Sequence, residues 1–148
     1  MKNIKIIHGP NLNLLGKREV EIYSKITLDE INTKIIKHCK NKNINIEIFQ
    51  SNHEGEIIDF IHQDHENFDG IVINPAGLTH YSISLRDAIT AVNTTTIEVH
   101  LSNIFAREEF RAKSVISPVA DGVISGLAYH GYLYAIDALL DIIKKGEK

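Results

Sequence analysis

"GIVINPAGLTHYSISLRDAITAV", residues 70–92, joins two patterns that together indicate one kind of fold. Segment 70–73 is a short continuous apolar run, which predicts a buried strand. Apolar residues then recur at helical spacing, which predicts a helix over 82–92. The residues that carry this spacing are Leu85, Ala88, Ile89 and Val92. A strand followed by a helix is the repeating unit of folds with a parallel sheet.

The same unit recurs on both sides of this segment. Strand-like apolar runs also lie at residues 4–7, 44–49, 95–99 and 122–125. Helices are predicted near 27–39, 56–65 and 132–143, where apolar residues again follow helical spacing. The first of these helices opens on Thr27-Leu28-Asp29-Glu30, which has the sequence of a capping box.

Strands that alternate with helices predict an α/β protein with a flavodoxin-like three-layer fold and a five-stranded parallel sheet. The common strand order for this fold is 2-1-3-4-5, and its ligands bind at the carboxyl ends of the strands near the switch point. Residues just after three of the strands should therefore gather at one edge, namely 9–11, 74–77 and 100–102. The chain is long enough for one sizeable core, so residues 1–148 are expected to form a single domain.

Composition narrows the classes of partner. The formal net charge is -3 and Lys and Arg form no block, which argues against nucleic acid or an anionic membrane as the main partner. No apolar window is long enough to span a membrane, and residues 1–8 lack the features of a signal peptide. The lone cysteine, Cys39, falls on the apolar face of a predicted helix and is expected to be a core residue. We therefore expect a cytoplasmic protein in a reducing compartment.

A long loop follows the first predicted strand. Beyond residue 10 the chain shows no regular pattern until the capping box, and loops longer than about 12–15 residues are usually lids, binding loops or linkers. Its far part carries Arg18 and Tyr23, a cation and a phenol that are available for chemistry. We expect residues 15–24 to form a mobile lid, with Gly16 as a permissive hinge.

Familiar cofactor motifs are incomplete in this sequence. Gly9 and Gly16-Lys17 suggest a phosphate-binding loop, but the glycines are too far apart and Arg18 stands where Ser or Thr is required. No G-x-G-x-x-G follows the first strand, which removes the main support for a dinucleotide site. His62 and His65 are one helical turn apart, yet no third metal ligand has convincing spacing, and a solvated helix face accounts for them better.

Longer stretches of the sequence resemble one enzyme family. They are GPNLNLLGKRE with IY after it, QSNHEGEIIDFIH, DGIVINPAGLTHYSISLRDA, IEVHLSNIFAREEFR and SPVADGVISG, in the family's order over nearly the whole chain. Together they are similar to type II 3-dehydroquinate dehydratase, the shikimate-pathway enzyme also called type II dehydroquinase. Two places depart from the usual pattern: His8 replaces a common Asn, and Pro75-Ala76-Gly77-Leu78 replaces a more usual Pro-Gly-Ala-Tyr.

The resemblance implies loss of water from 3-dehydroquinate to give 3-dehydroshikimate through an enolate, with no metal or organic cofactor. It implies that Tyr23 is the base and that Arg18 favours its phenolate, because a cation within about 4–6 Å favours the charged form. His100 would be the acid that protonates the departing hydroxyl, and Glu98, on the same strand face, would orient it. Asn11 would orient water or the groups that stabilise the enolate.

The resemblance also implies a set of substrate-binding residues: side chains for the hydroxyl groups, backbone amides for the carboxylate, and an amide side chain near the enolate. The hydroxyl groups would be bound by His80, Arg111 and Asp87, and the carboxylate by the backbone N–H groups of Leu101 and Ser102. The amide side chain near the enolate would be Asn74. The family assembles as a homo-oligomer, a dodecamer built of trimers. In that assembly an aspartate like Asp87 lies at a neighbouring subunit's site.

Two other functions stay open on the sequence alone. A flavodoxin-like regulatory or ligand-binding module would use the fold without catalysis, because fold does not dictate chemistry. A flavin-binding protein would be coloured when purified, whereas we expect a colourless one. Single residues decide little, since Asp87 could simply pair with Arg86 or Arg111, and a lone histidine is more often structural than catalytic. The combination of a base and an acid favours the enzyme.

Overall fold

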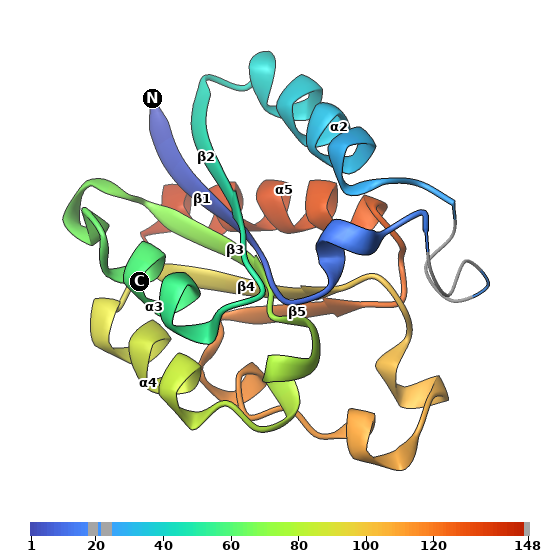
Figure 1. Ribbon diagram of the computed structural model, residues 1–148. Coiled ribbons are helices and arrows are strands. Elements are labelled where there is room, and N and C mark those ends of the chain that lie inside the picture. Colours follow the sequence, from blue (N-terminus) through green and yellow to red (C-terminus); the bar gives the residue numbers. More distant parts are fainter. Residues whose placement is uncertain (18–20, 22–24, 147–148) are drawn as a thin grey trace.

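The computed structural model describes residues 1–17, 21 and 25–146. Its centre is a five-stranded sheet with parallel pairing throughout, in the order β2-β1-β3-β4-β5 (Figure 1). The strands are β1 (Lys2–His8), β2 (Ile44–Gln50), β3 (Gly70–Asn74), β4 (Thr95–His100) and β5 (Gly122–Ser125). The predicted α/β fold and strand order are confirmed.

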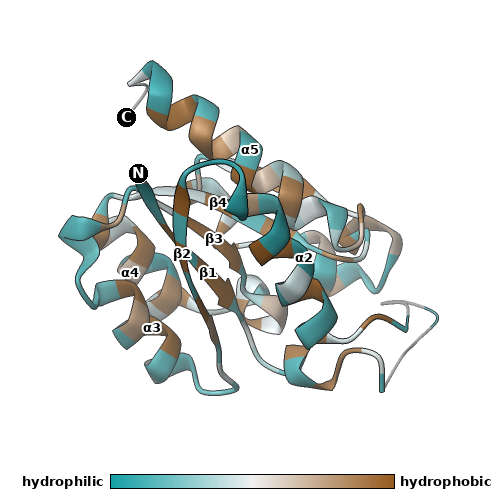
Figure 2. Ribbon diagram, turned by 90° about the horizontal axis from the view of Figure 1, so that it is seen from above, coloured by the Kyte–Doolittle hydropathy of each residue, from teal (hydrophilic) through white to brown (hydrophobic). Residues whose placement is uncertain are grey.

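Helices cover both faces of this sheet. They are α2 (Leu28–Lys40), α3 (Glu54–His62), α4 (Ile83–Val92) and α5 (His130–Lys145). Helices α2 and α5 pack on one face and α3 and α4 on the other, which gives three layers (Figure 1). Hydrophobic residues concentrate in the strands between the layers (Figure 2). Within the described part of the chain, no helix combines the length and the apolar character needed to cross a membrane.

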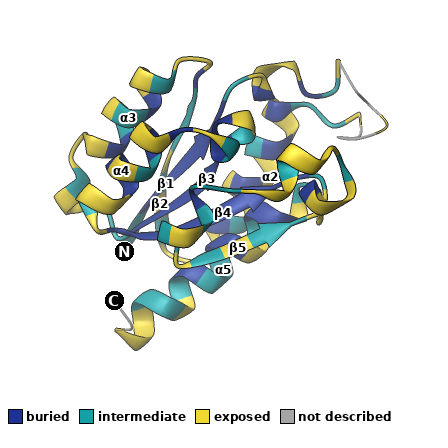
Figure 3. Cartoon of the chain, turned by 90° about the horizontal axis from the view of Figure 1, so that it is seen from below, coloured by how far each residue is buried: buried dark blue, intermediate teal, exposed yellow. Residues whose placement is uncertain are grey.

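Two apolar clusters join the layers. The cluster under α2 and α5 contains Ile4 and Ile6 of β1, whereas the cluster under α3 and α4 contains Ile7. Successive residues of a strand face opposite sides of the sheet, so β1 supplies both clusters. Buried residues follow the strands, and exposed residues lie on the outer sides of the helices (Figure 3). Burial on both faces explains why β1, β3 and β4 are rich in apolar residues, whereas the edge strand β2 alternates apolar and polar residues.

The cap expected at the start of α2 is present, and α4 has a similar one. Thr27 Oγ1 accepts a hydrogen bond from the backbone N–H of Glu30 at 3.2 Å, which is one half of the predicted capping box. Ser82 Oγ accepts from the backbone N–H of Leu85 at 3.0 Å, so it caps α4 in the same way. Each cap satisfies a backbone donor that has no partner inside the helix.

The predicted extent of α3 is wrong at both ends. The helix begins at Glu54 and stops at His62, and His65 starts a separate 3-10 turn. The helix ends because Gln63 leaves the helical conformation with a ψ of 119°, and Asp64 follows with a left-handed φ of 51°. His62 and His65 therefore do not share a helical face. Among the residues described, no group of three or more His, Cys, Asp or Glu is placed to hold a metal ion.

The long loop after β1 is partly regular and partly anchored. A 3-10 turn spans Leu12–Leu14, and the buried side chains of Leu12 and Leu15 join the apolar cluster under α2 and α5. Gly16 has a φ of +83°, and a Cβ atom there would lie 2.8 Å from the carbonyl oxygen of Lys25. Gly16, near the start of the expected lid at residues 15–24, therefore lies close to Lys25, the residue that follows the lid.

Candidate active site

A cavity opens at the edge of the sheet where β1, β3 and β4 end. The loops that follow these strands supply its lining, as expected for a doubly wound sheet. Polar groups of the lining belong to Asn11, Asn74, His80, His100, Ser102, Arg107 and Arg111, and the other lining residues are Pro10, Leu12, Ala76, Gly77, Leu101 and Ile104. The segments 9–11, 74–77 and 100–102 thus meet at one edge, as the sequence predicted.

Gly9 lets the loop after β1 pack directly on the loop after β3. Its N–H donates to the carbonyl oxygen of Asn74 at 2.8 Å, which extends the pairing of the two strands. A Cβ atom at Gly9 would lie 2.6 Å from the carbonyl oxygen of Pro75, so a larger residue does not fit without a shift. Asn11 then turns the chain with a left-handed φ of 71°, and its N–H donates to Asn52 Oδ1 at 2.8 Å.

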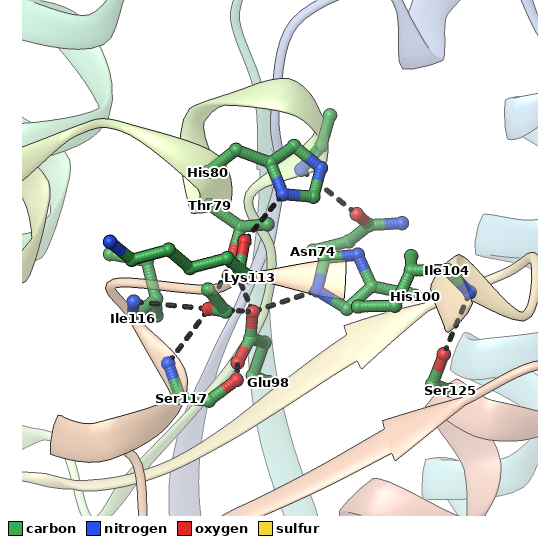
Figure 4. Close-up of polar contacts among 12 residues, drawn as sticks. Asn74, Thr79, His80, Glu98, His100, Ile104, Lys113, Ile116, Ser117 and Ser125 are labelled. Atoms are coloured by element: carbon green, nitrogen blue, oxygen red, sulfur yellow. Dashed lines mark hydrogen bonds and ion pairs between the residues drawn. The ribbon is translucent and has the colours of Figure 1, made fainter. Parts of the chain in front are cut away.

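His100 occupies the last position of β4, with a buried carboxylate beside it. Nε2 of His100 lies 2.7 Å from Oε1 of Glu98, and both side chains are almost completely shielded from solvent (Figure 4). The structure therefore places Glu98 where it can orient the ring of His100. The ring itself lies in the wall of the cavity, so a bound molecule can reach it.

Glu98 accepts hydrogen bonds from hydroxyl groups as well as from the imidazole. Ser114 Oγ donates to it at 3.0 Å, and the hydroxyls of Thr79 and Ser117 lie closer still (Figure 4). Burial by itself would raise the pKa of Glu98, but hydrogen bonds from His100, Ser117 and Thr79 outweigh it and hold the pKa below its usual value. Glu98 is therefore an ionised acceptor, and the proton between the two side chains belongs to Nε2 of His100.

His80 reaches the cavity from the 3-10 segment Ala76–His80. Its Nδ1 donates to the backbone carbonyl of Lys113 at 2.7 Å, because a carbonyl oxygen only accepts (Figure 4). The edge of its ring meets the ring of Phe110, with 6.0 Å between the centroids. These contacts hold the imidazole in place and leave Nε2 for a ligand.

The chain after β4 is held by the segment after β5. The N–H of Ala128 donates to the carbonyl of Leu101 at 3.0 Å, and Ser125 Oγ donates to the carbonyl of Ser102 at 3.1 Å. Ser125 Oγ also accepts from the N–H of Ile104 at 3.4 Å (Figure 4). Leu101 and Ser102 therefore line the cavity on a fixed backbone, which suits recognition of a ligand by main-chain groups.

Two arginines from the loop after β4 add positive charge to the cavity. Arg111, which the sequence had singled out, donates from Nε to Glu108 at 2.9 Å. Arg107 was missed; it donates from Nη1 to Ser102 Oγ at 3.3 Å, and its side chain is only 12% exposed. The available signal was a pair of cations one helical turn apart, soon after a strand end. Such a lining suits an anionic ligand.

Other predicted residues are not brought into this cavity. Asp87 is exposed on α4 and does not line the cavity of its own chain. The two arginines considered as its partners make other contacts, since Arg86 donates to a backbone carbonyl at 3.0 Å and Arg111 to a glutamate. Tyr23 and Arg18, the predicted base and its activator, lie outside the described residues.

Comparisons with known proteins point to one family. The family model described as Dehydroquinase class II matches residues 2–140. A protein of Halothermothrix orenii named 3-dehydroquinate dehydratase is 58% identical, over 99% of this chain and 99% of its own length. A protein of the same name from Clostridium botulinum is 52% identical, over 99% and 100%. A crystal structure described as type II dehydroquinase from Butyrivibrio crossotus has a TM-score of 0.92 at 50% identity, covering 94% of this chain and 97% of its own.

Proposed function

The chain belongs to the class II dehydroquinase family, and we propose that it removes water from 3-dehydroquinate to give 3-dehydroshikimate in the shikimate pathway. One observation carries this proposal, namely the pairing of His100 with the buried carboxylate of Glu98 at the wall of the cavity. An imidazole held in this way can give a proton to a departing hydroxyl group. That transfer is the acid step that a dehydration requires.

The proposed reaction needs a base, a stabilised enolate and an acid. Tyr23, as a phenolate, removes the proton next to the ketone, and the electron pair moves onto the carbonyl oxygen. Asn11 stabilises or orients the groups around this oxyanion, an effect typically worth about 10²–10³ in rate per donor, and Asn74 binds the substrate beside it. The enolate then collapses, the carbon–oxygen bond breaks, and the hydroxyl leaves as water with a proton from His100. The proton held by Tyr23 must be passed on before the next cycle.

The substrate is an anion, and the cavity offers groups that fit it. We place its carboxylate at the backbone N–H groups of Leu101 and Ser102, next to the guanidinium of Arg107. His80 and Arg111 face the same cavity and would bind the hydroxyl groups of the ring. The carboxylate of Glu98 is fully buried behind His100 and does not line the cavity, and hydroxyl groups and the imidazole fill its acceptor positions.

We propose that residues 15–24 form a lid which carries Arg18 and Tyr23 to the bound substrate. The contact between Gly16 and Lys25 supports this assignment, because a segment whose two ends meet can move without disturbing the sheet. Closure would exclude water and strengthen the attraction between Arg18 and the phenolate of Tyr23, since the effective dielectric constant falls in a dry site.

We also propose that the active unit is a homo-oligomer, a dodecamer built of trimers, in which Asp87 lies at a neighbouring subunit's site. Exposed apolar side chains near the start of α4 support an interface there, with Tyr81 67% and Ile83 56% exposed. Light scattering tests this proposal, and a fully active monomer near 16.6 kDa would overturn it. The buried free thiol of Cys39 supports the further prediction of a reducing, cytoplasmic location.

The proposed function is tested by the ultraviolet absorbance of the conjugated enone that forms from 3-dehydroquinate. The purified chain should produce this signal without an added cofactor, and His100→Ala should lower turnover by about 10²–10⁴. His62→Ala is the matched control, because it removes an exposed imidazole that does not line the cavity. A folded wild-type chain that forms no enone would overturn the function. A fully active His100→Ala variant would remove the proposed acid.

A further inference from the structure

A chain of polar side chains runs beneath the cavity and ends at Asn74. Nε2 of His8 lies 2.8 Å from Oδ1 of Asn32 in α2, and Nδ1 of His8 lies 2.8 Å from Oη of Tyr132 in α5. Asn74 at the end of β3 is the register partner of His8, so both side chains lie on the face of the sheet that α5 covers, and a hydrogen bond with Asn74 opposes the rise in the pKa of Tyr132 that burial causes. His8 and Tyr132 are fully buried and Asn74 is 3% exposed. Buried polar groups are costly unless each has a partner, so we expect this row of hydrogen-bonded side chains to have a function.

Burial determines the charge of His8. It lowers the pKa of this imidazole to about 4, against a smaller opposing effect of the hydrogen bond with Asn32. The ring is therefore neutral near pH 7, with one nitrogen that donates and one that accepts. An edge-on contact with the ring of Tyr132, at 5.1 Å between centroids, holds the imidazole in its orientation.

The backbone N–H of Ala76 sets the direction of every hydrogen bond in the row from Asn74 through Tyr132 and His8 to Asn32. It donates to Asn74 Oδ1 at 3.0 Å, so the amide oxygen of Asn74 faces the backbone and Nδ2 is left to meet Tyr132. Oη of Tyr132 accepts from that amide and gives its own proton to Nδ1 of His8. The remaining proton of His8 lies on Nε2 and is donated to the carbonyl oxygen of Asn32. The reverse direction would set the amide donors of Asn74 against the N–H of Ala76.

We propose that His8 and Tyr132 are positioning residues, which fix the Asn74 amide so that it presents an N–H, and not its oxygen, to the substrate in the cavity. The amide has two protons on Nδ2, and Tyr132 takes only one of them. The other is available in the wall of the cavity, where Asn74 lies. This inference rests on the proposed function for its substrate, whereas the orientation of the amide does not depend on it.

The tautomer of His8 tests the orientation of the Asn74 amide without any substrate. Nitrogen NMR on histidine-labelled protein near neutral pH should show a non-protonated Nδ1 and a protonated Nε2 for the buried ring, assigned by its loss in His8→Asn. A proton on Nδ1 would overturn the proposal, because Tyr132 would then have to donate toward the Asn74 oxygen. If the wild-type chain forms no enone, the proposed function fails, and the tautomer alone still decides the orientation of the amide.

Kinetics of Tyr132→Phe test the positioning role. This change keeps the ring and removes the hydroxyl, so the Asn74 amide loses one of its two anchors. KM for 3-dehydroquinate should rise about 3- to 10-fold, the effect of one neutral hydrogen bond, while kcat changes less than about twofold. In an Asn74→Ala background, Tyr132→Phe should have no further effect on KM, because the group through which it acts is gone.

The matched control is Thr96→Val, at the other end of the same sheet. Thr96 is also fully buried, and its Oγ1 donates to the backbone carbonyl of Thr94 at 2.8 Å, far from the cavity lining. It should reduce thermal stability without changing KM. An unchanged KM in folded Tyr132→Phe, or an equal rise in KM with and without Asn74, would show that Tyr132 merely packs the core and would overturn the proposal.

Discussion

Nε2 of His100 and Oε1 of Glu98 lie 2.7 Å apart at the end of β4, and the carboxylate is completely buried. Since the carboxylate only accepts, it fixes which ring nitrogen holds the proton and which way the ring faces. Thr79, Ser114 and Ser117 hold the carboxylate in turn.

We predict that Glu98→Gln lowers kcat by about 10- to 10²-fold, the worth of a hydrogen bond to a charged group. The glutamine keeps the shape of the side chain, but its NH₂ group would face hydroxyl donors and the N–H of His100. Steady-state enone formation measures the effect. Glu66→Gln, the same chemical change at an exposed turn before β3 and at the opposite end of the strands, should leave kcat unchanged. Equal activity of the two variants would exclude an orienting role for Glu98.

A second prediction concerns stability against pH. The pKa of His8 is about 4 in the folded chain, whereas an unfolded histidine has a pKa near 6.5. As the pH falls from about 6.5 toward 4, the unfolded chain takes up a proton at this site and the folded chain does not. This site therefore lowers the free energy of unfolding by about 2 kcal/mol between pH 6.5 and 5, and the loss is absent above that range.

Urea unfolding of wild type and His8→Asn at several pH values checks this prediction. Asn does not titrate, so the free energy of unfolding of the variant should change less over the same range. The other histidines are common to both proteins and cancel in the difference. Parallel pH profiles for the two proteins would mean that His8 is not protected from protonation by the fold.

A third prediction tests the close approach of the loops after β1 and β3. Gly9→Ala should reduce the free energy of unfolding by about 1–3 kcal/mol, because its Cβ would press on the carbonyl of Pro75. Gly55→Ala, where a Cβ meets nothing within 4 Å, should be neutral or should raise it by up to about 1 kcal/mol through helix propensity. Thermal or urea denaturation separates the two, and a tolerated Gly9→Ala would show that the contact relaxes easily.

Much of the fold and part of the site could be predicted from the sequence. Short runs rich in apolar residues marked every strand, and the doubly wound order then brought Asn11, Asn74 and His100 to one edge without any knowledge of side-chain contacts. The end of α3 at His62 was not predicted, because neither Gly nor Pro marks the turn at Gln63 and Asp64 that ends the helix.

The side chains that hold the site residues in place could not be predicted from the periodicity of the sequence. Ser114 and Ser117 approach Glu98 from an irregular segment before β5, where no periodicity tells which hydroxyl faces inward. In the sequence Arg107 resembles any surface arginine. Only the course of the loop after β4 shows that its side chain lies in the cavity wall. The contact between His8 and Tyr132 joins residues 124 positions apart, so only the packing of α5 on the sheet reveals it.

In the proposed mechanism a phenolate on the lid and an imidazole at the end of β4 share the dehydration, and Tyr23→Phe removes the phenolate alone. This change keeps the ring and removes the one proton acceptor that the proposed base supplies. Enone formation from 3-dehydroquinate, measured beside wild type at equal concentration of folded protein, should fall by about 10²–10⁴ in kcat. If folded Tyr23→Phe turns over substrate at the wild-type rate, the phenolate mechanism and the assigned purpose of the loop are both wrong.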